Sequence, residues 1–152
     1  MSDKTRRYLI FSPDERLWKF NQPVVFLGNW CCSYKRKNVW SNMDFVIADP
    51  YGTPLQRNAH YASVRQLEDE LFPILCDLLN SYHNTQYNSK FWKIVLGTWF
   101  QRYVDVIYNR VETLKVCFKN YNISGVTVHE SIEYDLATID SLSAIWSFND
   151  DR

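Results

Sequence analysis

Apolar residues occur in this chain as short runs near both ends and as helical repeats in the middle. Continuous apolar runs of about 4–8 residues are typical of strands buried on both faces of a parallel sheet. The runs that fit this description are residues 7–11, 23–28, 44–47 and 126–129. We therefore predict a parallel sheet that contains residues 8–11, 24–27 and 126–128, with helices packed against it.

Two long segments repeat their apolar residues at helical spacing. The first covers residues 63–82 and opens with the Ser-x-x-Gln pattern of a capping box. Pro73 lies inside it and should kink the helix, because proline removes one hydrogen bond to the preceding turn. The second helix begins at Ser89, which can cap it, and runs to about Tyr121.

Two shorter helical segments lie outside these. Residues 14–21 can form a short helix or turn with Trp18 and Phe20 as apolar anchors. Residues 138–150 look like the opening of another helix. We expect residues 142–148 to be helical and to leave apolar surface exposed, as they would in a chain that continues.

Strands that alternate with helix-sized segments favour the α/β class. The predicted architecture is a small, mostly parallel sheet flanked by helices, a Rossmann-like lobe with two long central helices. A length of 152 residues fits one such domain, so residues 1–152 are taken as a single α/β domain.

The composition narrows the functional classes. Seventeen basic residues balance 17 acidic ones, which argues against a general binder of nucleic acid. Aromatic residues reach 16% of the chain, which calls for a thick aromatic core or aromatic binding surfaces. No run approaches the roughly 20 apolar residues of a membrane span, and no secretory signal is visible.

The four cysteines, at positions 31, 32, 76 and 117, match neither a disulfide framework nor a zinc motif. Free thiols favour a reducing, cytoplasmic location. No glycine-rich nucleotide fingerprint or P-loop occurs, so no cofactor and no metal is expected.

Several blocks of the chain together resemble a bacterial family. They are Asp14-Glu15, Trp18, residues 23–31, residues 91–99 and Arg110. The chain resembles the amino-terminal region of transferases of surface-carbohydrate (O-antigen type) biosynthesis, first noted in spirochaetes. It differs from that pattern at Asn29, where an acidic residue is expected, and at Thr98, where a proline is expected.

The resemblance implies a function and partners. Members are several times longer than this chain and resemble two-lobed, GT-B type glycosyltransferases, whose carboxy-terminal lobe usually binds the nucleotide-sugar donor. Residues 1–152 would be the amino-terminal, acceptor-side lobe of such an enzyme, with the donor lobe missing. A carbohydrate acceptor and a nucleotide-sugar donor would then be the partners of the full-length protein. The alternative is a non-catalytic binding or assembly domain, the remnant of a shortened gene.

Three residues are candidates for catalysis. Asp14 and Glu15 follow the first strand, at the edge of the sheet where open α/β proteins bind ligands. Either carboxylate could act as a general base on an acceptor hydroxyl, or the pair could simply start a helix. His129 follows the fourth strand and is either a general base or a surface histidine.

Candidate substrate-binding residues cluster after the second strand. Gly28 could let the backbone approach a ligand, and Trp30 could stack on a sugar ring or fill the core. Asn29 lies between them, and the resemblance adds Trp18 and Trp99. The nearby stretch 34–37 mixes aromatic and basic residues, which indicates a solvated helix face more than a nucleic-acid surface.

Arg110 breaks the charge pattern of the second long helix. On a helical wheel it falls in the middle of the apolar side, whereas the other charged residues lie opposite. Arginine stays protonated, so a desolvated Arg110 needs an anionic or carbonyl partner. The sequence leaves two interpretations open. One is a buried ion pair with a carboxylate such as Asp14, Glu15 or Asp44, and the other is a site for a substrate phosphate or carboxylate.

Overall fold

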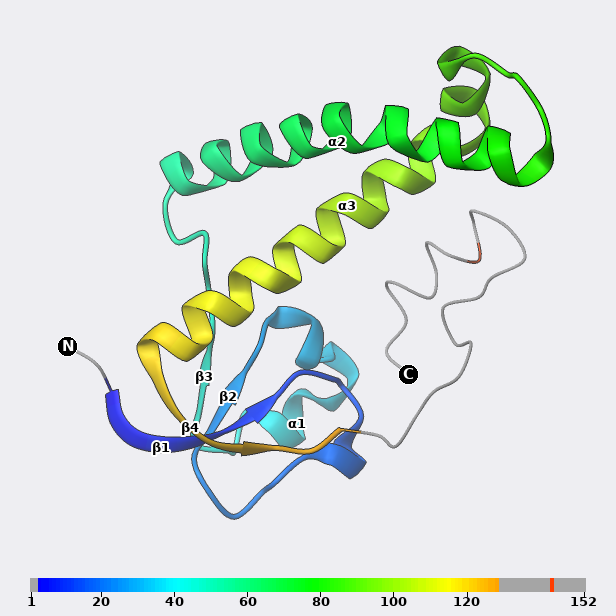
Figure 1. The fold of residues 1–152 in the computed structure, drawn as a ribbon. Helices are drawn as coiled ribbons and strands as arrows, with labels where there is room; N and C mark the ends of the chain where they lie inside the picture. The colour runs from blue at the N-terminus through cyan, green and yellow to red at the C-terminus, as the bar shows by residue number, and fades with distance from the viewer. Residues whose placement is uncertain (1–2, 129–142, 144–152) are drawn as a thin grey trace. The chain divides into compact units, whose positions relative to one another are not determined.

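The computed structural model describes residues 3–128 and residue 143 (Figure 1). Its described residues form two compact units. The sheet unit consists of residues 3–50 and 110–128, and the helical unit consists of Tyr51–Asn109.

The sheet unit is built on four parallel strands. They are β1 (Asp3–Ile10), β2 (Val24–Phe26), β3 (Phe45–Ile47) and β4 (Tyr121–Val126). Their spatial order is β3-β2-β1-β4, and Leu9 pairs with Val25 on one side and with Val126 on the other. The predicted α/β fold with a small parallel sheet is confirmed.

The core of this unit is continuous across both faces of the two central strands. Val24, Val25 and Phe26 have no accessible surface, although successive residues of a strand point to opposite faces. Cys31 from the segment after β2 and Cys117 are equally buried in the same cluster. Burial on both faces explains why β2 is a short apolar run rather than an alternating one.

The predicted position of the fourth strand is several residues too far along the chain. β4 begins at Tyr121, whereas the prediction started it at residue 126. Its sequence contains Asn122 and Gly125, residues that strands usually avoid, so its apolar pattern is weak. Gly125 is useful at this position because it pairs with Tyr8, whose ring lies 3.4 Å from where a Cβ would stand.

Short helical turns follow β1 and β2. They are η1 (Glu15–Leu17), η2 (Asn29–Cys31), η3 (Tyr34–Arg36) and α1 (Lys37–Trp40). Trp18 is a buried anchor as predicted, but Phe20 is not, because 48% of it is exposed. The basic stretch at η3 is solvent-exposed, as expected of a solvated face.

The helical unit is formed by α2 (Pro54–His83) and most of α3 (Ser89–Asn120), which continues into the sheet unit. α2 starts nine residues before the predicted residue 63, because Thr53 and Gln56 form the capping box that begins the helix. The helix assignment runs through Pro73 without a break. Asn88 rather than Ser89 caps α3, since its side chain accepts a hydrogen bond from the Phe91 amide.

α2 and α3 pack through a small apolar core of their own. Val64 of α2 meets Phe100 and Val104 of α3, and the Phe72 and Phe100 rings lie 5.3 Å apart. Asn80 holds the connection between the helices by hydrogen bonds to Thr85, Tyr87 and Trp92. The helix predicted over residues 138–150 and the segment 142–148 lie, except for Ser143, outside the described residues.

Candidate functional site

The candidate site lies at the carboxyl ends of β1 and β2. The segment after β1 starts at Phe11, and the segment after β2 leads through Gly28 into η2. The strand order also changes direction at β1, because β2 and β3 lie on one side of it and β4 on the other. In open α/β sheets ligands bind beyond the carboxyl ends of strands where the order reverses.

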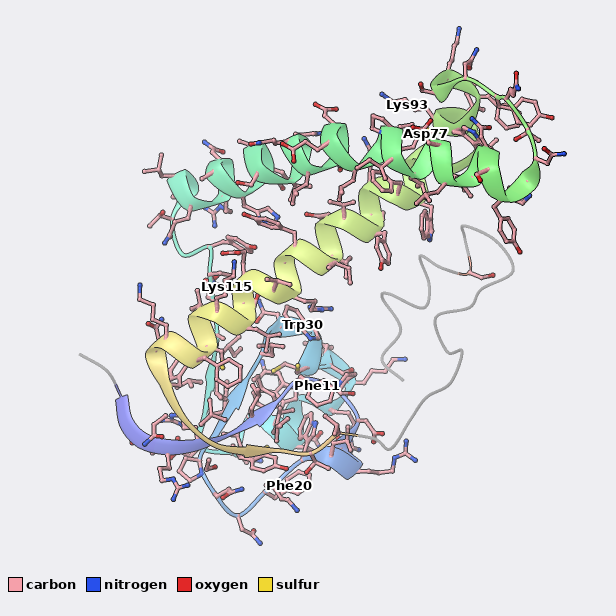
Figure 2. The ribbon with its side chains drawn as sticks, in the orientation of Figure 1. Phe11, Phe20, Trp30, Asp77, Lys93 and Lys115 are labelled. Carbon is pink, nitrogen blue, oxygen red and sulfur yellow. The ribbon has the colours of Figure 1, made fainter. Side chains whose placement is uncertain are left out.

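Trp30 links these two segments. Its indole nitrogen donates a hydrogen bond to the carbonyl oxygen of Phe11, at 3.2 Å (Figure 2). Gly28 lies directly against the ring, since a Cβ at this position would be 2.0 Å from Cζ3 of Trp30. Glycine is therefore required here by close approach to the ring, and the backbone at Gly28 is ordinary extended chain.

Arg110 of α3 stacks on the same ring. Its guanidinium carbon lies 3.3 Å from the centroid of the Trp30 ring, the geometry of a cation–π contact. Burial lowers the pKa of Arg110, and the adjacent Cys31 partly opposes this shift. The ring face that Arg110 covers is not available for stacking on a sugar.

The carboxylates proposed as partners of Arg110 are all engaged elsewhere. Asp14 pairs with Arg16, Glu15 with Arg36 and Asp44 with Arg7. No ion pair of Arg110 is present within residues 3–128. The ion-pair interpretation is therefore wrong for the described part of the chain, and half-buried Arg110 rests on an aromatic ring instead.

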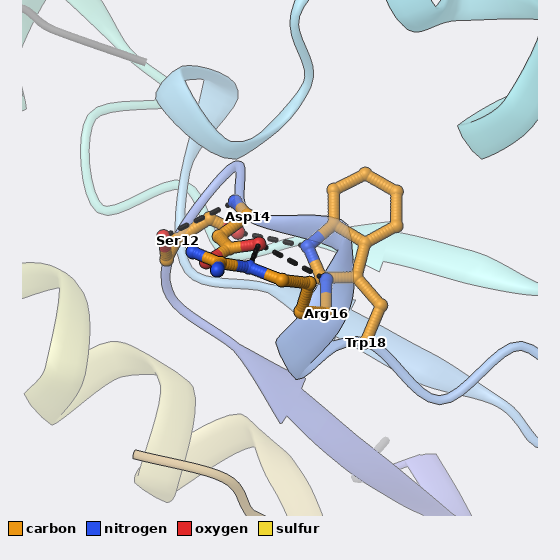
Figure 3. Close-up of polar contacts among 4 residues, drawn as sticks. All are labelled: Ser12, Asp14, Arg16 and Trp18. Atoms are coloured by element: carbon orange, nitrogen blue, oxygen red, sulfur yellow. Dashed lines mark hydrogen bonds and ion pairs between the residues drawn. The ribbon is translucent and has the colours of Figure 1, made fainter. Parts of the chain in front are cut away.

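The segment after β1 is held in one conformation by its own hydrogen bonds (Figure 3). Asp14 accepts hydrogen bonds from the Arg16 amide and guanidinium, at 3.0 and 2.6 Å. The Asp14 amide donates to Ser12 Oγ, and the Trp18 indole donates to the Ser12 carbonyl at 2.9 Å. Asp14 thus caps η1, which is the structural alternative that the sequence left open.

Glu15 ties this segment to the one after β2. Arg36 donates two hydrogen bonds to the Glu15 carboxylate, at 2.6 and 2.7 Å. The hydrogen bond from Arg36 holds the pKa of Glu15 below its usual range, against a smaller opposing effect of burial. Arg36 was not among the predicted site residues, because in the sequence it belongs to an exposed basic stretch.

Cys31 lies in the segment after β2, next to Trp30, and its thiol is unreactive. Its side chain is fully buried and contacts the Ile10 carbonyl at 3.5 Å. Burial raises the pKa of the Cys31 thiol to about 12. A thiol with this pKa is no nucleophile near neutral pH.

The predicted substrate-binding residues do not all meet. Gly28 and Arg110 each contact Trp30, and Asn29 is exposed beside them at the start of η2. Trp18 belongs to the neighbouring segment after β1. Trp99 lies in the helical unit, where it stacks on Tyr103. His129 is outside the described residues.

The helical unit has a polar groove between α2 and α3 of about 250 Å³. Arg65, Glu68, Asp69 and Lys93 contribute charged groups to it, and the ion pair between Arg65 and Glu68 has an N–O distance of 3.0 Å.

Within residues 3–128 and residue 143, no cluster of three His, Cys, Asp or Glu side chains could hold a metal ion. None of the helices in that part of the chain is long and apolar enough to cross a bilayer.

The small parallel sheet and its strand order define a Rossmann-like α/β protein. The profile of the LIC12162 family transferase matches residues 7–152. The chain therefore belongs to this transferase family, which agrees with the transferase resemblance of its sequence blocks. No curated protein and no solved structure is significantly similar to it.

Proposed function

We propose that residues 1–152 are the amino-terminal, acceptor-side lobe of a glycosyltransferase-like enzyme of bacterial surface-polysaccharide biosynthesis. Membership of a transferase family supports group transfer. The carbohydrate substrates, and a donor-binding lobe that follows in the full-length protein, come from the sequence resemblance. In the reaction, an acceptor hydroxyl displaces a nucleotide from an activated sugar donor. The four free thiols support a cytoplasmic location.

Arg110 is the observation that carries this proposal. Its guanidinium is half-buried, fixed on Trp30 and free of a carboxylate partner within residues 3–128. A guanidinium binds phosphate and carboxylate groups through paired hydrogen bonds. Because Arg110 lies beside the carboxyl ends of β1 and β2, it can bind an anionic group of the substrate at the usual ligand edge.

In this proposal, the main role of the two carboxylates near this edge is to hold the segments after β1 and β2 in place. Proton transfer is not their main role. Asp14 holds the segment after β1, and Glu15 joins it to Arg36. A carboxylate in a charged pair with a lowered pKa is a weaker base than a free one. His129 remains the candidate for the general base that activates the acceptor hydroxyl.

The test uses the protein encoded by the intact gene and a panel of nucleotide sugars. Binding and sugar transfer are measured for the natural protein and for Arg110→Met. Arg6→Met is the matched control, because Arg6 is an exposed arginine of β1. We expect Arg110→Met to lose both activities and Arg6→Met to keep them. Binding without transfer by the natural protein would favour a non-catalytic domain, and equal activity of both variants would contradict the role of Arg110.

A further inference from the structure

The groove between α2 and α3 lies wholly within the helical unit. It consists of two adjoining hollows of about 250 and 200 Å³, which share four lining residues: Arg65, Glu68, Thr98 and Gln101. Its apolar part belongs to the packed core of the two helices, with Phe100 in the first hollow and Val64 in the second. The role proposed for the sheet edge does not explain this groove.

Gly97 of α3 leaves one wall of the groove without a side chain. Glycine is about 1 kcal/mol less favourable than alanine inside a helix, so its place within α3 needs a reason. Close packing of the helices is not the reason. Among the described residues, a Cβ at Gly97 would approach only Cγ of Lys93 on the same helix, at 3.3 Å, and no atom of α2 within 4 Å. Gly97 therefore keeps open a space that the helices themselves do not fill.

Glu68 places a mostly buried carboxylate where the two hollows adjoin. The residue is only 9% exposed. Arg65, one turn earlier, donates a hydrogen bond to Glu68 Oε2 at 3.0 Å. No second hydrogen bond to this carboxylate is present within residues 3–128 and residue 143. Oε1 of Glu68 is therefore a charged acceptor that a donor in the groove can use.

The charges that line the groove balance one another. There are three basic and three acidic residues: Arg65, Lys93, Arg102, Glu68, Asp69 and Asp105. Asp105 is held in place by His60, whose Nε2 lies 3.1 Å from its Oδ1. Thr98 and Gln101 add neutral groups that both donate and accept hydrogen bonds. A ligand in the groove thus meets donors and acceptors of both charges together with an apolar surface.

This combination of groups suits a neutral carbohydrate. A sugar hydroxyl both donates and accepts, so one ligand can donate to Glu68 and accept from Arg65 or Lys93. The C–H face of a sugar ring can pack on the apolar surface.

Other classes of ligand fit these groups less well. A phosphate or carboxylate would lie against Glu68, and an amine would lie against Arg65, so each would be repelled. A nucleobase needs a flat stacking surface, but the rings of Phe72 and Phe100 are tilted by 55° to each other. An extended peptide pairs with free backbone groups of a strand, which two helices do not offer.

We propose that the groove between α2 and α3 binds a neutral carbohydrate. Glu68 accepts hydrogen bonds from its hydroxyls, and Gly97 provides the space for a sugar ring. The site belongs to the helical unit and does not depend on Arg110. It is therefore additional to the anion site proposed at the sheet edge.

The test follows the assigned amide NMR signals of Thr98 and Gln101 in the 152-residue chain while a sugar is added. One sugar is maltotriose, which is neutral, and the other is trigalacturonate, which has a carboxylate on each ring. We expect saturable shifts with maltotriose and at least about tenfold weaker binding of trigalacturonate, because Glu68 repels it. Arg110→Met should bind maltotriose as the natural chain does, which separates this site from the one at the sheet edge.

Gly97→Leu should weaken maltotriose binding at least about tenfold, because the new side chain fills the groove. It should not lower the resistance of the chain to urea, because leucine favours a helix more than glycine does. Ala59→Leu is the control, since Ala59 is exposed on α2 and does not line the groove.

Glu68→Gln should also weaken maltotriose binding about tenfold, through loss of the charged acceptor. Glu70→Gln makes the same change at an exposed position of α2 and should leave binding unchanged. The proposal would be overturned by an absence of saturable shifts with maltotriose or by tighter binding of trigalacturonate. Equal maltotriose affinities in Gly97→Leu and Ala59→Leu, or a loss of binding in Arg110→Met, would overturn it as well.

Discussion

Arg110 and Trp30 are far apart in the sequence, yet the guanidinium carbon of one lies 3.3 Å from the ring centre of the other. The contact joins α3 to the segment after β2, next to the carboxyl end of β1. Its energy is modest, about 0.5–2 kcal/mol for a cation–π pair. A half-buried arginine held by so weak a contact contributes little to folding, which agrees with a role in binding an anion.

Gly28→Ala tests whether the position of the Trp30 ring depends on glycine. The new Cβ would meet the ring at 2.0 Å, so the ring must move and its hydrogen bond to Phe11 is lost. We expect a loss of about 1–3 kcal/mol in the free energy of unfolding by urea. Gly52→Ala is the control, because its nearest contact is 3.9 Å away at the end of a glutamine side chain. Equal stabilities of the two variants would show that Trp30 is not packed on Gly28.

Asn80→Ala should loosen the connection between α2 and α3. The Asn80 side chain accepts hydrogen bonds from Tyr87 and Trp92, at 3.1 and 3.0 Å, and donates one to the Tyr87 carbonyl at 2.9 Å. We expect a loss of about 2–4 kcal/mol in thermal or urea unfolding. Asn58→Ala, at an exposed position of α2, should be nearly neutral. A neutral Asn80→Ala would mean that water replaces these bonds without loss.

The pairing of Glu15 with Arg36 predicts a dependence of stability on pH. The pKa of Glu15 is lower in the folded protein, so the folded state holds its proton less tightly than the unfolded chain. The stabilisation is therefore complete above the ordinary glutamate pKa of about 4.3 and is lost as the pH falls through the lower, folded value. We expect a small effect, since the Arg36 side chain of the pair is 54% exposed. Urea unfolding between neutral and acidic pH measures it, and Glu15→Gln should abolish this part of the acid loss. An unchanged pH profile in Glu15→Gln would contradict the assignment.

Cys31 and Cys117, which are buried, and Cys32, which is partly buried, should resist alkylation in the folded protein. Burial raises the pKa of Cys31 to about 12 and those of Cys32 and Cys117 to about 11. Near pH 8 we expect these thiols to react at least about a hundredfold more slowly than an ordinary cysteine. Mass spectrometry after iodoacetamide treatment measures this, and the same protein in urea should react at all four positions. Rapid native modification of Cys31 would mean that the segment after β2 opens readily.

The sheet could be predicted where the sequence is locally apolar. β2 and β3 are short apolar runs, and the positions of both strands, with the parallel pairing of β1 and β2, followed from that pattern. β4 could not be placed, because its burial comes from pairing with β1 and its own residues include Asn122 and Gly125. The start of α2 was missed for a related reason. The segment between residues 54 and 63 is mostly exposed and has no run of buried apolar residues, so only the capping box at Thr53 marks its beginning.

The candidate site could be predicted only in part. The helical wheel identified Arg110 as a charge on an apolar face, and the glycine and tryptophan after β2 were singled out by their place in the sheet. The contact between Arg110 and Trp30 depends on how α3 packs, which no local pattern contains. The pairing of Glu15 with Arg36 was missed because both are ordinary surface residues until the two segments come together.

The most direct test of the account is whether Arg110 binds an anion beside Trp30. The Trp30 indole N–H signal, assigned with a Trp30→Phe variant, is followed by NMR while inorganic phosphate is added to the 152-residue chain. We predict a saturable shift of this signal in the natural chain and in Arg6→Met, and at least about a tenfold loss of phosphate affinity in Arg110→Met. Phosphate affinity that is the same in Arg110→Met as in the natural chain would contradict the account.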